Sequence, residues 1–180
     1  MATRWLDDEE QATWRSFIAV VELLPGVLDT QMRHESGLTH FDYLVLAMLS
    51  EDPQRTLRMT ALAGWTNATL PRLSHVVRRL EGRGLVERFP CPEDARATNA
   101  RLTDRGWDTL VAAAPGHVET VRGQVFDALT PEQVGQLAGI AQAILGRISP
   151  GGRPLSPGAG PVSPGQRGTA EAVTTGPAPA

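Results

Sequence analysis

Apolar residues recur every three or four positions over residues 7–34, the spacing of an amphipathic helix. The stripe consists of Trp14, Phe17, Ile18, Val21, Leu24, Leu28 and Met32. Pro25 and Gly26 fall within it, so we expect a kink or a break there. At 1.5 Å per residue this helix spans about 40 Å, more than a small domain covers. Its apolar face therefore predicts a partner chain, with packing on its own domain as the alternative.

The middle of the chain shows three shorter helical patterns. The first runs from Thr39, which can cap it, to Ser50, and a second begins near Met59. The third covers residues 69–81 and ends at Gly82-Arg83-Gly84. Its expected inward residues are Leu70, Leu73, Val76, Val77 and Leu80.

Two short strands, residues 85–89 and 98–102, follow around a polar loop. A long helix then begins at Thr103, with a possible bend at Pro115, and Thr130-Pro131-Glu132-Gln133 is a strong start signal for a last helix. The expected fold is mainly α with a small β-hairpin. It is a winged helix-turn-helix with its DNA-binding part at about residues 53–105, plus N- and C-terminal dimerisation helices at about residues 7–34 and 107–148.

Composition limits the other possibilities. Residues 149–180 hold seven of the 14 prolines and seven of the 18 glycines, so we expect a disordered tail after one domain of residues 1–148. There is no long apolar run and no signal-peptide pattern, which favours a cytoplasmic protein without a membrane partner. A single cysteine and four scattered histidines give no metal-ligand spacing, and we expect no cofactor.

The formal net charge of -3 hides an uneven distribution. All 17 basic residues are arginine, and ten of them lie between Pro53 and Arg105 against five acids. That segment carries +5 and the remainder -8. A basic segment in an acidic protein points to a polyanion such as nucleic acid, although an unevenly charged surface is the simpler alternative.

The segment between the second and third short helices predicts a helix-turn-helix. Asn67 suits a turn position with positive φ, Ala68 fills the turn, and Thr69 caps the next helix. With the inward residues assigned, the outer surface of this helix carries Pro71, Arg72, Ser74, His75, Arg78 and Arg79. A helix fits the major groove and its N-terminal residues meet base edges, so we expect Arg72 to contact guanine. Arg78 and Arg79 are better placed for phosphate.

The hairpin tip, residues 90–97, supplies a second candidate contact. An arginine on a projecting loop can enter a narrow minor groove, as Arg96 would here. Asp94 could pair with Arg96 and fix its direction.

These segments together resemble the MarR family of regulators. The matching motifs are Leu62 to Leu80, Glu81-Gly82-Arg83-Gly84-Leu85-Val86-Glu87-Arg88, Asp94-Ala95-Arg96-Ala97, Leu102-Thr103-Asp104-Arg105-Gly106 and Leu129-Thr130-Pro131-Glu132-Gln133. The resemblance implies a homodimeric winged-helix repressor that a small-molecule effector releases from DNA. By position, Thr69 to Arg79 match the recognition helix, and Asp94 and Arg96 match the wing pair; Arg88, just before the tip, completes the DNA-binding candidates. Asn67 stands where glycine is common, and Ala95 where a second wing arginine often occurs.

A two-fold dimer would place two recognition helices in successive major grooves, so the expected target is an inverted repeat in double-stranded DNA. Two other functions remain open: a winged helix that binds proteins, and a regulator that senses oxidation through Cys91 in the wing. The chain has no Walker loop, H-E-x-x-H or G-x-S-x-G motif, and we do not expect an enzyme.

Overall fold

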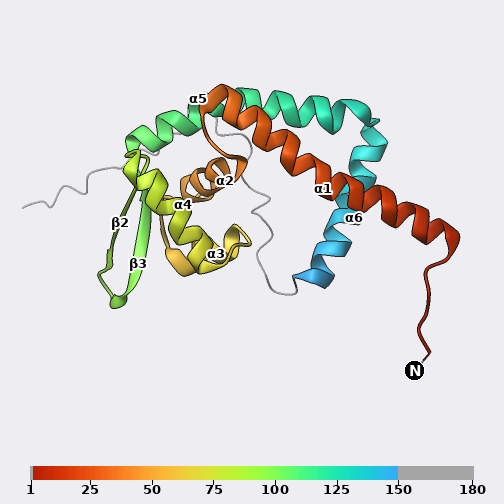
Figure 1. The fold of residues 1–180 in the computed structure, drawn as a ribbon, viewed down its shortest axis with the longest axis horizontal. Helices are drawn as coiled ribbons and strands as arrows, with labels where there is room; N and C mark the ends of the chain where they lie inside the picture. Colours follow the sequence, from red (N-terminus) through yellow and green to blue (C-terminus); the bar gives the residue numbers. More distant parts are fainter. Residues whose placement is uncertain (1, 150–180) are drawn as a thin grey trace, which may run out of the picture.

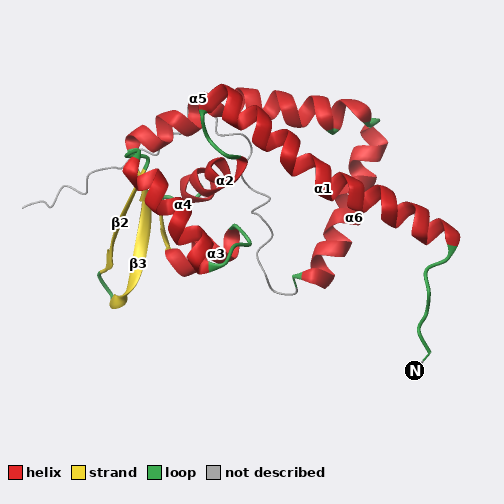
Figure 2. Cartoon of the chain, viewed as in Figure 1, coloured by secondary structure: helices red, strands yellow, loops and turns green. Residues whose placement is uncertain are grey.

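The computed structural model describes residues 2–149 and forms two parts, a helix-rich arm and a smaller mixed part that carries the wing (Figures 1 and 2). The tail expected to be disordered lies outside the described residues, except for Ser149. The arm contains α1 (Asp8–Ser36), α5 (Asp104–Gln124), a 3-10 turn (Phe126–Ala128) and α6 (Pro131–Ile148). The mixed part contains α2 (His40–Ser50), β1 (Thr56–Arg58), α3 (Met59–Trp65), α4 (Leu70–Gly82), β2 (Val86–Cys91) and β3 (Asp94–Leu102).

Side-chain caps start most of the helices where the sequence predicts them. Thr39 and Thr130 each form a capping box, in which the threonine hydroxyl accepts the N3 amide and the N3 side chain accepts the cap amide. Asp7 forms a third box at the start of α1. Pro25 and Pro115 both lie inside continuous helices, so of the kink or break expected near Pro25 the break does not occur. The arm helices α1 and α5 contact each other, and Gly116 of α5 lies beside Gln31 and Glu35 near the C-terminal end of α1 (Figure 1).

The sheet has three antiparallel strands in the order β1-β3-β2, one more than the expected hairpin. β1 has only three residues and pairs Leu57 with Ala100 of β3. A strand this short carries little periodicity, so the sequence does not reveal it. The hairpin strands are longer than expected and continue to Cys91 and Asp94, which makes the wing project beyond the helices (Figure 2).

One hydrophobic core joins α2, α3, α4, the sheet and the start of α5. Leu46, Leu62, Leu73, Leu80 and Leu110 are fully buried in it. Leu70 is an exception among the inward residues expected in α4, because it is 43% exposed. It is the first residue of the helix and lies past the edge of the core, beside the wing.

The arm is much less buried than the mixed part. Only Leu28 and Met32 are buried in the 29 residues of α1, and no residue of α6 is buried. Within residues 2–149, no helix combines the length and hydrophobicity that a bilayer span requires.

Candidate nucleic-acid interface

The turn between α3 and α4 has the geometry that the sequence predicts. Asn67 has a φ of 47°, in the left-handed region that asparagine tolerates. Ala68 packs against the core, and the Thr69 hydroxyl accepts a hydrogen bond from the Arg72 amide at 3.4 Å. The turn therefore fixes where α4 starts and which of its faces points outward.

The outer surface of α4 divides into three strips, because successive residues turn by about 100° around a helix. Leu73, Val76, Val77 and Leu80 face the core. The outward crest carries Pro71, His75 and Arg78, all exposed. Leu70 and the half-buried Ser74 lie on the flank toward the wing, while Arg72 and Arg79 lie on the opposite flank.

The flank away from the wing faces the first turn of α2. The Arg72 guanidinium lies over the Phe41 ring, 4.4 Å from its centroid. Arg79 Nη2 lies 2.5 Å from Oδ1 of Asp42, a carboxylate that is only 2% exposed. Arg79 therefore has a partner within the fold, whereas the sequence predicts a phosphate contact for it. Arg78 on the crest forms no ion pair among the described residues.

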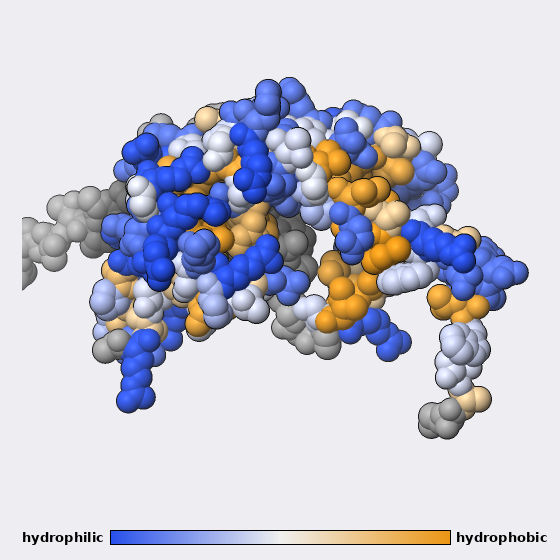
Figure 3. Space-filling model, viewed as in Figure 1, coloured by the Kyte–Doolittle hydropathy of each residue, from blue (hydrophilic) through white to orange (hydrophobic). Residues whose placement is uncertain are grey.

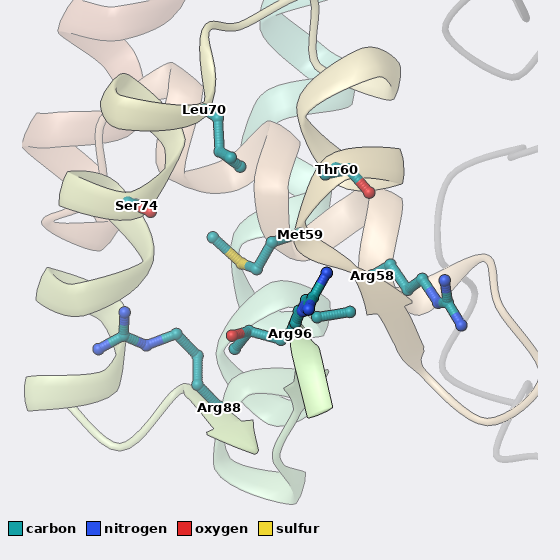
Figure 4. A pocket seen from close by; sticks show the side chains of 9 residues that line it. Arg58, Met59, Thr60, Leu70, Ser74, Arg88 and Arg96 are labelled. Atoms are coloured by element: carbon teal, nitrogen blue, oxygen red, sulfur yellow. The ribbon is translucent and has the colours of Figure 1, made fainter. Parts of the chain in front are cut away.

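A hollow of about 180 Å³ separates the other flank of α4 from the wing (Figure 4). It is lined by Arg58, Met59, Thr60, Leu70, Ser74, Arg88, Arg96, Ala97 and Thr98. Three of these residues are arginines, three carry hydroxyl groups, and none is acidic. Of the three arginines, only Arg96 directs its side chain into the hollow, and those of Arg58 and Arg88 extend away from it on either side (Figure 4). The hollow thus offers one guanidinium and several hydroxyl groups to an anion.

The other two arginines of the lining, Arg58 and Arg88, each pair with a carboxylate outside the hollow. Arg88 donates to Glu81 Oε2 from Nη2 at 2.6 Å and from Nε at 3.0 Å. This hydrogen bonding lowers the pKa of the Glu81 carboxyl below its ordinary value. Arg58 Nη2 lies 3.6 Å from Glu93 Oε2 and 3.5 Å from the sulfur of Cys91, which is itself buried.

The acid–arginine pair expected at the wing tip exists in a different form. Asp94 Oδ1 accepts a hydrogen bond from the backbone amide of Arg96 at 3.0 Å, and no contact between the two charged groups accompanies it in the described structure. Asp94 therefore stabilises the backbone of the turn by an Asx-type hydrogen bond. The Arg96 side chain is exposed and points into the hollow (Figure 4).

The ten predicted DNA-binding residues thus fall into four groups. Pro71, Arg72, His75, Arg78 and Arg96 present exposed side chains, and Ser74 and Arg88 line the hollow. The side chains of Thr69 and Asp94 accept hydrogen bonds from backbone amides, and Arg79 pairs with Asp42. The sequence interpretation missed Arg58, Thr60 and Thr98, which line the hollow from β1, α3 and β3, because only the packing of these elements brings them together.

A second polar cluster lies where the arm meets the mixed part. The His117 ring of α5 stacks on His40 of α2, with 5.9 Å between centroids, and lies 4.5 Å from the Tyr43 ring. Burial lowers the pKa of both histidines, and the neighbouring His40 lowers that of His117 further. His117 Nδ1 and the nearby Gln31 Oε1 are buried without hydrogen-bond partners. In residues 2–149 no three His, Cys, Asp or Glu side chains gather as metal ligands.

Hydropathy separates the two parts of the surface. In the view of Figure 3 polar side chains cover the mixed part, and apolar side chains gather over α1 and α6. The exposed apolar side chains of these two helices include Trp14, Phe17, Val20, Val21, Leu23, Val27, Leu137, Ile140, Ile144, Leu145 and Ile148.

Comparison with known proteins places this architecture in a family. Residues 38–98 match the sequence model of the MarR family. The HTH-type transcriptional regulator YdcH of Bacillus subtilis is 30% identical over 114 residues, which cover 61% of this chain and 75% of YdcH.

Two solved structures from Streptomyces coelicolor are similar along most of the chain. The MarR family transcriptional regulator Sco3205, whose structure is a complex with DNA, is 46% identical with a TM-score of 0.80, covering 83% of this chain and 94% of Sco3205. The MarR family regulator AbsC is 38% identical with a TM-score of 0.76, covering 81% of this chain and 98% of AbsC. With the helix-turn-helix, the three-stranded winged sheet and the arm helices all in place, the chain belongs to the MarR family of transcriptional regulators.

Proposed function

We propose that the chain is a homodimeric repressor that binds an inverted repeat in double-stranded DNA and is released by a small-molecule effector. The observation that carries DNA binding is the set of exposed arginines on α4 and the wing, with a hollow between them. Arg78 and Arg96 are exposed there, and the hollow between them has three arginines and no acid in its lining. The structure of the similar Sco3205 as a complex with DNA supports DNA binding by this chain.

The geometry of a duplex explains why the hollow lies where it does. If α4 enters the major groove and Arg96 the adjacent minor groove, one sugar-phosphate strand must pass between them. That strand would cross the hollow, where Arg96 and the hydroxyl groups of Thr60, Ser74 and Thr98 line its path. Glu81 and Glu93 already pair with the guanidinium groups of Arg88 and Arg58. Arg72, in the first turn of α4, is then nearest to base edges.

The apolar surface of α1 and α6 supports the homodimer. Ile148 and Leu23 are 71% and 69% exposed, and Ile140 is 57% exposed. A contiguous apolar surface of this kind marks an interaction site in a folded protein. Burying this surface against a second copy would place the two recognition helices on the same face of the dimer. Their two-fold relation predicts half-sites about one turn of the DNA helix apart.

The cluster at the junction of arm and mixed part supports an effector. Its two unpartnered buried atoms, on Gln31 and His117, can hydrogen-bond a small polar ligand. A ligand bound at this cluster would favour one spacing of the two recognition helices over another, and would thereby change the affinity of the dimer for DNA.

Selection of genomic fragments bound by the protein tests the DNA proposal. The enriched fragments should share an inverted repeat, and log affinity should fall with log salt at a slope near -7 to -9 if each subunit meets four or five phosphates. Arg78→Ala should weaken all duplexes alike, whereas Arg72→Ala should cost about 1–3 kcal/mol and relax one base position. Absence of any enriched repeat, or salt-independent binding, would contradict the proposal.

The repressor and effector proposals need separate measurements. A promoter that contains the enriched repeat should be less active when the protein is present, and small aromatic and phenolic compounds should be screened for those that restore it. Activation of that promoter would overturn the assignment as a repressor.

A further inference from the structure

The contact between Phe41 and Arg72 joins two elements that lie far apart in the sequence. Phe41 belongs to the first turn of α2, and Arg72 to the first turn of α4, and these helices pack against each other (Figure 1). The guanidinium carbon lies 4.4 Å from the ring centroid, within the range of a cation–π interaction. The contact therefore fixes the direction of the arginine nearest to base edges in the proposed complex.

Phe41 is a firm support for this contact. Its ring is half-buried and packs against the hydrophobic core, while Arg72 stays exposed. The same turn of α2 contains Asp42, whose side chain holds Arg79 two turns further along α4. The two arginines are seven residues apart and share one flank of α4, so the first turn of α2 restrains that flank at two points.

An aromatic ring and a carboxylate restrain an arginine side chain in different ways. In the pair of Arg79 with Asp42, one edge of the guanidinium is already occupied by an acceptor. A ring contacts only the face of the guanidinium, so its N–H groups remain available in the plane. No carboxylate lies within ion-pair distance of Arg72 in residues 2–149. Arg72 is thus held in direction while its donors stay free for a DNA acceptor.

The first turn of α2 is itself tied to the arm. The His40 amide donates to Asp29 Oδ1 of α1 at 2.9 Å, and the His40 ring stacks on His117 of α5. The turn that carries Phe41 is therefore held in place by α1 and α5, and the position of the ring does not depend on α4 alone.

We infer that Phe41 is a positioning residue for sequence recognition: its ring presets the Arg72 guanidinium so that the free N–H edge meets a base in the major groove. This inference rests on the proposed function, because it assigns Arg72 a base contact. Preorganisation reduces the side-chain entropy lost on binding, so removal of the ring should weaken the specific complex selectively.

The test compares Phe41→Leu, Arg72→Ala and the double variant on two duplexes, the repeat enriched by the wild-type chain and an unrelated duplex of equal length. Leucine keeps an apolar side chain against the core and removes the ring face. We expect Phe41→Leu to weaken repeat binding about 2–5-fold, the range of an exposed cation–π contact, and to leave the unrelated duplex unchanged. In the Arg72→Ala background the same change should have no further effect. Phe41→Tyr should restore the affinity.

Phe89→Leu is the matched control. Phe89 also lies under an arginine, Arg101, at 5.1 Å, but that arginine is already paired with Glu87. Its removal should leave the ratio of repeat to unrelated binding unchanged. Thermal unfolding of each variant at equal concentration verifies folding, and Phe41→Met provides a second variant if leucine destabilises the core.

The outcomes separate the two proposals. If no repeat is enriched, the proposed function fails. If a repeat is enriched and Arg72→Ala relaxes it, but Phe41→Leu is neutral or weakens both duplexes equally, the assignment of Phe41 is wrong while the proposed function stands. If Phe41→Leu also weakens repeat binding in the Arg72→Ala background, the assignment of Phe41 is wrong as well, because the ring then acts through packing and not through Arg72. If Arg72→Ala has no effect on the repeat, Phe41 positions no base contact.

Discussion

The buried carboxylate of Asp42 gives a stability prediction that distinguishes two neighbouring arginines of α4. Arg79 Nη2 lies 2.5 Å from Asp42 Oδ1, and the Asp42 side chain is 2% exposed while that of Arg79 is 44% exposed. Asp42 Oδ2 also accepts the Thr39 amide at 2.9 Å, which completes the cap of α2. Arg79→Ala would therefore leave a buried carboxylate with only a neutral donor.

The size of this effect follows from the burial of the two partners. Breaking a fully buried pair by removing one partner costs about 3–5 kcal/mol, whereas an exposed pair contributes about 0–1 kcal/mol. One partner here is buried and the other is partly open to solvent, so we expect Arg79→Ala to lower the free energy of unfolding by about 2 kcal/mol. Arg78→Ala is the control. That arginine is exposed and forms no ion pair among the described residues, so its loss should change stability by less than about 0.5 kcal/mol.

Urea unfolding at a fixed protein concentration is the appropriate assay, because a dimer's stability depends on concentration. With a slope of about 1–3 kcal/mol per molar urea, 2 kcal/mol shifts the midpoint by about 1 M. The double variant Asp42→Asn/Arg79→Ala should recover part of the loss, since asparagine keeps an acceptor for Thr39 without a buried charge. Equal midpoints for Arg78→Ala and Arg79→Ala would refute the reasoning.

Three further predictions follow from particular residues. Ile140→Glu on the exposed face of α6 should convert a dimer into monomers in light scattering and reduce DNA affinity at least tenfold, because an interface would bury the unpaired charge; an unchanged dimer mass would contradict it. Gly106→Ala should destabilise by more than about 3 kcal/mol in urea unfolding, since its Cβ would lie 2.0 Å from a backbone oxygen, whereas Gly123→Ala, with open space around it, should be neutral or stabilising. Burial lowers the pKa of His40 and His117 in the fold. Below the ordinary histidine pKa of about 6.5, these two residues therefore bind more protons in the unfolded chain than in the folded one. Stability should therefore fall with pH below about 6.5, by at most about 1.4 kcal/mol per pH unit for each histidine, and replacing both with asparagine should flatten that region of the unfolding profile.

The sequence by itself determined the elements whose signals are local. Thr39, Thr69 and Thr130 begin their helices as expected, because a cap depends on a hydroxyl and an amide three residues away. Asn67 takes a positive φ because its own side chain tolerates that conformation. The inward face of α4 followed from periodicity alone, apart from Leu70 at its end. The family resemblance rests on the same local motifs in a fixed order.

Only the tertiary structure decided what each arginine does. Arg79 is 37 residues from Asp42 and Arg58 is 33 from Cys91, and no periodicity in the sequence relates such distant positions. Periodicity places Arg72, Arg78 and Arg79 on the outer surface of one helix, yet the structure places one on a ring, one in solvent and one against a buried acid. The hollow beside the wing likewise needs the pairing of β1 with β3. Helix starts depend on neighbours along the chain, whereas the partner of a long charged side chain depends on which helices and strands pack together.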